Sequence, residues 1–281
     1  MPRSPPRGTV RPVLSRTEHL ATVASTNDVV AGWLADGVDE VCLAWADEQT
    51  AGRGRRGRTW VAPPGAALLL SLGFRPAWLA AERTWRLAAT ASLAMADAAE
   101  EAAGLSDRAI RLKWPNDLVV VDPPDRGGAV RKVGGVLGEA SGIGTDDPRV
   151  VVGIGLNVAW TASAFPPDLA ASMTSLLVEN GGRAVDRDLL FEGFISRLEP
   201  RIEALRGGRF AVADWDARQL LRRTPVRLVH GTTVADAGEA EDVVAIGVDP
   251  ISGALVVEDA TSPDGERLVH AGEIAHLRVG V

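Results

Sequence analysis

The sequence predicts an α+β protein in which strands and long helices form a first domain and a small β-barrel follows. Apolar, strand-like segments alternate with long helical segments up to about residue 222. From Thr224, short strands follow one another at close spacing with turns between them, which is typical of a small barrel. A chain of 281 residues is expected to contain one or two domains. We therefore place a domain boundary near Arg222.

The N-terminal part predicts a tail, one short helix and two strands. Residues 1–13 are rich in Pro and Arg and show no periodicity, so they predict a loose tail. The polar run from Ser25 to Asp28 is typical of a helix N-terminus, and the helix is expected to end at Gly37. Two apolar strands are predicted at 41–47 and 66–74, with a Gly/Arg loop between them at 50–58.

The remainder predicts two long helices and a series of short strands. Residues 82–103 are rich in Ala, with Leu and Met on a repeating face, and predict the strongest helix. A second long helix begins at acidic residues and ends at Gly207-Gly208. In chain order, the predicted segments are strands 109–113, 118–121, 132–139 and 149–158, helices 186–206 and 212–221, and barrel strands 226–229, 232–235, 242–248, 254–257, 266–271 and 275–279.

Composition and charge exclude several classes of protein. Hydrophobic residues make up 46% and charged residues 24%, as in ordinary globular proteins. The single cysteine, Cys42, excludes an intramolecular disulfide and a Cys-cluster metal site. A net charge of −7 argues against a general nucleic-acid binder. No signal peptide and no membrane span are found, so we expect a cytoplasmic protein.

Several kinds of catalytic machinery do not occur in the sequence. There is no GxxxxGK[ST] segment, so ATP would not be held by a Walker P-loop. There is no GxSxG nucleophile elbow, and the four His lie apart without an HExxH motif. Lysine is scarce, with only Lys113 and Lys132 among 30 basic residues, so a specific role for each is more plausible than usual.

Two segments combine charge with backbone features that suit a ligand site. In GRGRRGR at 52–58, glycines let the backbone approach a ligand closely, and Arg makes bidentate contacts with phosphate or carboxylate. The alternative is a solvated basic loop. In KWPND at 113–117, proline predicts a turn that holds Asn116 and Asp117 at a strand end. The alternative there is a plain β-turn.

Two further segments place glycines beside polar residues. In RKVGGVL at 131–137, Lys132 opens a strand beside paired glycines and can reach a ligand lying over bare backbone; a surface lysine at a hairpin end is the alternative. In GIGLNV at 153–158, glycines alternate along one face of an apolar strand, so another group can pack on that face. Close helix packing is the alternative for this strand.

Taken together and in order, these segments resemble the biotin protein ligase family. The matching segments are STN at 25–27, EQTAGRGRRGRTW at 48–60, KWPND at 113–117, KVGGVLGE at 132–139 and GIGLN at 153–157, and the C-terminal part at 247–277 is also similar. The resemblance covers about residues 14 to 281. It implies a mixed β-sheet flanked by helices, of the class II aminoacyl-tRNA synthetase and biotin ligase type, at 14–222, and a C-terminal SH3-like β-barrel at 223–281.

The resemblance implies a two-step reaction with Mg²⁺ as cofactor. Biotin and ATP give biotinyl-5′-AMP and pyrophosphate, and a lysine of the biotin carboxyl carrier domain of an acetyl-CoA or acyl-CoA carboxylase then takes the biotinyl group. Lys132, Arg53 and Arg55 are the catalytic residues that it implies. It places biotin against Ser25, Thr26, Asn27, Gln49, Arg53, Gly54, Arg55 and Lys132. It places the nucleotide against Arg55, Arg58, Trp60, Asn116, Asp117, Lys132 and Asn157, and it assigns no metal ligands.

Elementary chemistry agrees with these implied roles. A carboxylate that attacks an α-phosphate brings two anions together, so cations are needed where charge accumulates. The nucleophile of the second step belongs to the partner protein, which accounts for the missing nucleophile motif. Asp117 is a candidate for deprotonating the incoming amine.

One departure from the family pattern and two alternative functions stay open at this point. Too few residues precede the first element for the DNA-binding domain of bifunctional relatives, so we expect a ligase that does not bind DNA, as a monomer or weak homodimer. Lipoate ligases share the catalytic fold and form one alternative. A nucleic-acid binder that uses the Arg loop is the other, although only Trp60 lies near the loop for base stacking.

Overall fold

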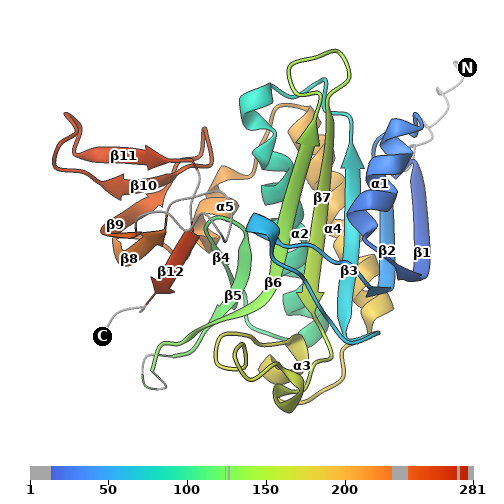
Figure 1. Cartoon of the computed structure of the whole chain (residues 1–281), viewed down its shortest axis with the longest axis horizontal. Helices are drawn as coiled ribbons and strands as arrows, with labels where there is room; N and C mark the ends of the chain where they lie inside the picture. Colours follow the sequence, from blue (N-terminus) through green and yellow to red (C-terminus); the bar gives the residue numbers. More distant parts are fainter. Residues whose placement is uncertain (1–13, 124, 126, 230–239, 271–272, 278–281) are drawn as a thin grey trace, which may run out of the picture.

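The structure is a computed structural model, and it describes residues 14–123, 125, 127–229, 240–270 and 273–277. A larger mixed sheet has helices on both faces, and the C-terminal strands form a smaller antiparallel sheet beside it (Figure 1). The expected tail at 1–13 and the expected strand at 232–235 lie outside the described residues. None of the helices in the described ranges combines the length and apolar character that a bilayer crossing needs.

Seven strands form the larger sheet, in the order β1-β2-β3-β7-β6-β5-β4. β1 and β2 are parallel and the other neighbours are antiparallel, which confirms the mixed sheet. The strands are β1 Arg16–Val23, β2 Cys42–Gln49, β3 Ala67–Phe74, β4 Ile110–Lys113, β5 Asp117–Val121, β6 Val130–Ser141 and β7 Arg149–Asn157.

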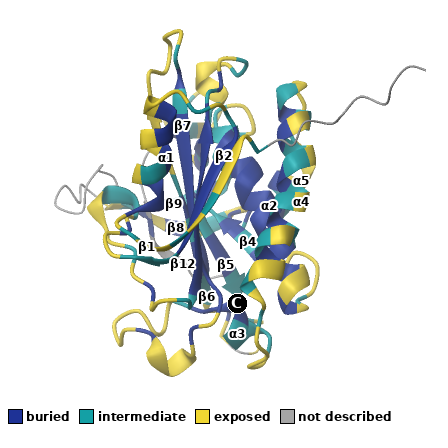
Figure 2. Cartoon of the chain, turned by 90° about the vertical axis from the view of Figure 1, so that its right-hand side faces the viewer, coloured by how far each residue is buried: buried dark blue, intermediate teal, exposed yellow. Residues whose placement is uncertain are grey.

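Alternation along β2 separates the two faces of this sheet. Cys42 and Ala44 pack against α1, whereas Leu43 and Trp45 belong to the main core under α2 and α4. Figure 2 shows the buried strands lying between α1 and the α2–α4 pair. β3 is buried at every position because both of its faces are covered. The helices are α1 Thr26–Ala35, α2 Trp85–Ala103, α3 Leu176–Glu179, α4 Arg187–Arg206 and α5 Val212–Arg218.

The predicted helices are present with small shifts at their ends. The long helix expected from residue 82 begins at Trp85 because Ala81–Arg83 form a separate 3₁₀ turn. It ends at Gly104, which takes the left-handed conformation with φ of 63° that glycine adopts at low cost. Asp186 is the N-cap residue of α4, and its side chain accepts hydrogen bonds from two backbone N–H groups of the first turn.

The C-terminal strands form a five-stranded antiparallel sheet in the order β11-β10-β9-β8-β12. Its strands are β8 Thr224–Val229, β9 Ala240–Val248, β10 Leu255–Glu258, β11 Glu266–Val269 and β12 Glu273–Leu277. Within the described residues β11 and β12 do not pair, so the sheet is open and the predicted SH3-like barrel is not confirmed. The change from one sheet to the other falls at Thr224, and the division into 14–222 and 223–281 stays a prediction.

Candidate active site

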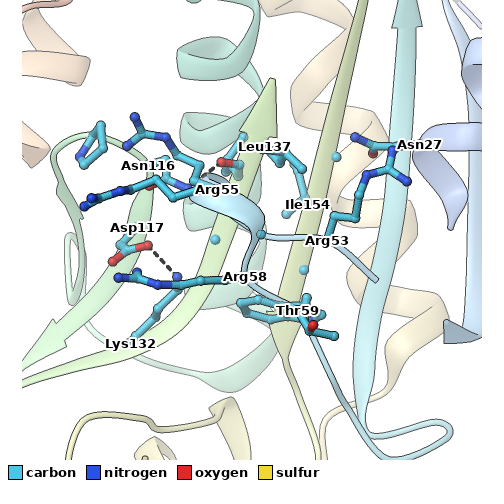
Figure 3. Close-up of a pocket in the computed structure, with 18 of the residues that line it drawn as sticks. Asn27, Arg53, Arg55, Arg58, Thr59, Asn116, Asp117, Lys132, Leu137 and Ile154 are labelled. Carbon is cyan, nitrogen blue, oxygen red and sulfur yellow. Dashed lines mark hydrogen bonds and ion pairs between the residues drawn. The ribbon is translucent and has the colours of Figure 1, made fainter. Parts of the chain in front are cut away.

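One pocket lies on the α1 face of the larger sheet. Its walls come from the start of α1, the end of β2, the Arg loop at 52–58, the KWPND turn at 113–117, and strands β6 and β7. Ile274 of β12 also lines it, so both sheets contribute. Segments far apart in sequence therefore converge on one place, with the Arg loop lying across them (Figure 3). The predicted site residues that line this pocket are Ser25, Thr26, Asn27, Gln49, Arg53, Gly54, Arg55, Arg58, Trp60, Asn116, Asp117 and Lys132.

The start of α1 carries three buried polar residues into the pocket wall. Ser25 is the N-cap residue in extended conformation, and Thr26 and Asn27 form the first turn. The backbone N–H of Thr26 donates to Gln49 Oε1 at 2.7 Å, so a β2 side chain satisfies one of the free donors at this helix end. Gly153 makes room for Asn27, because a Cβ there would lie 2.2 Å from Asn27 Oδ1.

A chain of hydrogen bonds runs behind this wall. The hydroxyls of Thr26 and Ser71 lie 2.7 Å apart, and Ser71 Oγ donates to Asn27 Oδ1 at 2.6 Å. Asn27 Nδ2 then donates to Glu139 Oε2 at 2.6 Å. Buried polar groups normally have hydrogen-bond partners, and here each side chain is a partner of the next one in the series. The chain joins α1, β3 and β6.

The Arg loop is anchored through its first arginine. Arg53 donates to Asp28 Oδ2 at 2.9 Å and to Glu139 Oε2 at 3.1 Å. These hydrogen bonds, first to Asp28 and then to Glu139, raise the pKa of Arg53 above its ordinary value. Figure 3 shows Arg53 directed toward Asn27, whereas Arg55 and Arg58 extend toward the side where Asp117 and Lys132 lie. The loop therefore carries cations to both ends of the pocket.

The backbone of the loop accounts for its glycines and for one strained residue. A Cβ on Gly52 would lie 2.4 Å from the carbonyl oxygen of Trp60, so only glycine fits this approach. Arg56 has φ of 60°, in the left-handed region that a non-glycine residue rarely adopts. Such strain gathers at ligand-binding segments.

Trp60 lies flat against the bare glycine face of β7. A Cβ on Gly155 would lie 2.6 Å from the Trp60 ring, so the glycine spacing in GIGLN is needed for this contact. Lys132 Nζ lies 5.4 Å from the centroid of the same ring and 2.6 Å from Asp117 Oδ1. The predicted lysine, aromatic and carboxylate residues are thus brought together.

The KWPND turn is held by hydrogen bonds on both sides. Asn116 Nδ2 donates to the Val136 carbonyl at 2.8 Å, which ties the turn to β6. Trp114 Nε1 donates to the Gly253 carbonyl at 3.1 Å, and Lys113 Nζ donates to the Ile274 carbonyl at 3.3 Å. The smaller sheet therefore fixes the turn that presents Asn116 and Asp117.

Asn157 is the predicted site residue that does not line the pocket. It is fully buried at the end of β7, and its Nδ2 donates to the Thr174 carbonyl at 3.0 Å. Its Oδ1 has no hydrogen-bond partner. A buried acceptor left unpaired is costly, so this atom needs an explanation.

Ser71, Glu139 and Ile274 are parts of the site that the sequence reasoning did not single out. Ser71 is the only polar side chain in the apolar run ALLLSLGF, and that isolated polarity was a usable signal. Glu139 closes the KVGGVLGE segment, but its partners lie on α1 and in the Arg loop, which no local pattern shows. Ile274 reaches the pocket through sheet packing alone.

Comparisons with known proteins agree on one family. Residues 20–157 match the model of the biotin/lipoate A/B protein ligase family. The chain is 33% identical to the biotin–[acetyl-CoA-carboxylase] ligase of Mycobacterium tuberculosis, over 92% of this chain and 88% of that protein. It is 35% identical to the ligase of the same name from Paracoccus denitrificans, over 91% of this chain and 98% of that protein. The crystal structure of biotin protein ligase from Aquifex aeolicus with biotin and ATP shares the fold, with a TM-score of 0.71 at 23% identity over 92% of this chain and 97% of that one.

Proposed function

Because the chain belongs to the biotin protein ligase family, we propose that it activates biotin with ATP and transfers the biotinyl group to a lysine of a carboxylase carrier domain. The observation that carries the proposal is the pocket itself. It brings Lys132, the Arg loop and the start of α1 together around the glycine backbone of β6 and β7. The roles given below to single residues are part of the proposal.

In the first step, a biotin carboxylate oxygen bonds to the α-phosphorus of ATP, and the bond from that phosphorus to pyrophosphate breaks. Two anions approach each other, so the barrier falls only where cations stabilise the accumulating charge. Lys132 is placed for this role, because its ammonium has two further N–H donors beyond the one on Asp117. Arg53 and Arg55 add charge from the loop side.

The ring of biotin is a cyclic urea, which carries two N–H donors and one carbonyl acceptor. Thr26 and Gln49 line the pocket next to the start of the loop and suit such a ring. Gln49 uses its carboxamide oxygen on Thr26, which leaves its NH₂ group to donate to a carbonyl. The dithiolane ring of lipoate offers neither group, and a site built for hydrogen bonds discriminates strongly against a ligand that lacks them.

The adenylate end of the pocket is assigned to Trp60 and its neighbours. An aromatic face beside Lys132 suits a purine, since base and ring can stack. Asn157 lies two residues beyond Gly155 on the same face of β7, and its unpaired Oδ1 is the acceptor assigned to an adenine amino group. This would explain the buried atom that the protein itself leaves without a partner.

Mg²⁺ is proposed to accompany ATP. The described residues contain no group of three His, Cys, Asp or Glu side chains that could cage a metal. However, Mg²⁺ is often held by one or two carboxylates together with substrate phosphates, and Asp117 with the Asn116 carboxamide oxygen fits such a set. When bound, the metal neutralises charge on the leaving pyrophosphate.

In the second step, the carrier lysine attacks the acyl carbon, an amide bond forms and AMP leaves. Asp117 is the proposed acceptor of the amine proton. The acyl-adenylate would react with water, so the Arg loop lying over it serves exclusion as well as binding. A cytoplasmic location, a monomer or weak homodimer and the lack of DNA binding belong to the proposal as expectations.

Lys132→Ala tests the assigned centre. We predict that biotin-dependent exchange of label between pyrophosphate and ATP falls by about 100-fold or more, as when one charge-stabilising donor is removed from other active sites. Arg83→Ala, which removes a half-exposed arginine away from the pocket, is the matched control and should keep normal exchange. Near-normal exchange in Lys132→Ala would refute the role of Lys132, and exchange that depends on lipoate in place of biotin would refute the substrate.

A further inference from the structure

Ser71 lies behind the pocket wall, where no ligand can touch it. It occupies the middle of β3 with zero exposure, and it does not line the pocket. Its neighbours in β3 are Leu70 and Leu72, so it is an isolated polar side chain in an apolar strand. Its hydroxyl instead contacts two residues that do line the pocket, Thr26 and Asn27.

The donor and acceptor of each hydrogen bond in the series from Glu139 to Ser71 follow from the Glu139 carboxylate. Glu139 can only accept, so the Asn27 group at 2.6 Å from it is the NH₂. The Asn27 oxygen is then an acceptor and takes the single proton of Ser71. Ser71 Oγ is left with lone pairs toward Thr26.

The consequence reaches Thr26, the last member of the chain. Its hydroxyl has one proton and two acceptors in the protein, Ser71 Oγ behind the wall at 2.7 Å and Gln49 Oε1 beside it at 3.0 Å. Whichever acceptor takes it, that proton is used within the protein and is not available to a ligand. Thr26 therefore presents only lone pairs to a ligand.

We infer that Ser71 is a positioning residue that fixes the Thr26 hydroxyl as a hydrogen-bond acceptor, so that the site selects a ring bearing an N–H at that point. The inference rests on the proposed function and deepens it by naming the group of the substrate that is recognised. Without the Ser71 oxygen, the Thr26 hydroxyl keeps only Gln49 Oε1 as an acceptor in the protein, and that oxygen already accepts from the Thr26 backbone. The hydroxyl can then turn and donate to a ligand.

The test compares biotin with the two cyclic carbamates in which one or the other ring N–H is replaced by oxygen. kcat/KM for each is measured by pyrophosphate exchange in wild type and in Ser71→Ala. Wild type should discriminate against one carbamate by about 10-fold to 100-fold, because a ring oxygen would face the lone pairs of Thr26. In Ser71→Ala that ratio should fall to within about threefold, since Thr26 can donate to the ring oxygen.

Two controls separate this role from a structural one. KM for ATP should not change in Ser71→Ala, and Thr90→Ala, at a buried polar residue of α2 outside the pocket, should keep the wild-type ratio. If Ser71→Ala does not fold, Ser71→Cys keeps only a weak donor and a weak acceptor in a similar space, and its ratio should lie below that of wild type.

An unchanged ratio in the folded Ser71 variant, or equal use of all three rings by wild type, overturns the inference while the ligase function stands. If the wild-type protein does not use biotin at all, the proposed function is refuted, and this inference is refuted with it.

Discussion

Glu100 of α2 shows how a single buried residue can hold several elements together. Its carboxylate accepts from the Ile110 backbone N–H at 2.8 Å and from both terminal nitrogens of Arg218, at 2.7 and 2.8 Å. Burial lowers the pKa of Arg218, but hydrogen bonds and the charges of Glu100 and Asp97 outweigh it, and the pKa lies above its ordinary value. This pair joins α2, β4 and α5 beneath the KWPND turn.

Glu100→Ala should therefore cost far more than an average substitution. Without Glu100, the buried Arg218 keeps only Asp97 as an ionic partner and the Ile110 N–H loses its acceptor, and breaking a buried ion pair typically destabilises a protein by about 3–5 kcal/mol. The free energy of unfolding in urea measures this loss. Glu101→Ala is the matched control, because its side chain is 70% exposed and its ion pair with Arg197 is worth at most about 1 kcal/mol. Equal losses in the two variants would contradict the assignment.

At the residue scale, the sequence identified the residues that line the pocket better than the residues behind them. Twelve of its thirteen site residues line one pocket. Scarce lysine, clustered arginine and turn chemistry mark part of them in the sequence, whereas Ser25, Thr26 and Gln49 came from the family resemblance alone. Ser71 and Glu139 act through partners on other strands and helices. Their role depends on strand register and helix placement, which short-range patterns do not contain. Those assignments themselves stay proposals.

At the element scale, the turn between β9 and β10 connects the smaller sheet to the site. The Ile251 carbonyl accepts from Trp85 Nε1 and the Gly253 carbonyl accepts from Trp114 Nε1, each at 3.1 Å. Gly253 has φ of 74°, and a Cβ there would lie 2.8 Å from the Trp85 ring. This turn therefore tolerates only glycine at the position that anchors Trp114.

Gly253→Ala should loosen that anchor. Backbone strain and the contact with Trp85 should cost about 1–3 kcal/mol, and a displaced KWPND turn should slow adenylate formation several-fold. Gly247→Ala is the matched control, because a Cβ at that glycine would meet nothing within 4 Å. Thermal unfolding and pyrophosphate exchange are measured for both variants. An unaltered exchange rate in Gly253→Ala would show that the smaller sheet does not position the turn.

Elements with strong periodicity or strong burial were predicted well, and weakly patterned ones were not. The Ala-rich helix and the apolar strand at 66–74 appear within a few residues of their expected ends. β1 was not predicted because it lies at the sheet edge and alternates between exposed and half-buried positions, with few apolar residues to mark it. Its pairing with β2 depends on a long-range contact rather than on local propensity.

At the scale of the whole molecule, an acidic protein lines one pocket with a cluster of cations. The net charge is −7, yet Lys132 and the arginines of the Arg loop line the same pocket. Carboxylates hold part of this charge in position, since Asp117 pairs with Lys132, and Asp28 and Glu139 pair with Arg53. We propose that this arrangement of charges lets two anionic substrates react and keeps their product from water.

Mass spectrometry of a biotin carboxyl carrier domain tests that claim most directly. The domain is incubated with the full chain, biotin and Mg·ATP, and omission of each small molecule is the control. We predict a mass increase of one biotinyl group on a single lysine, dependent on biotin and ATP, and no increase with Lys132→Ala. An unmodified carrier with the wild-type chain, or equal modification by Lys132→Ala, would contradict the account.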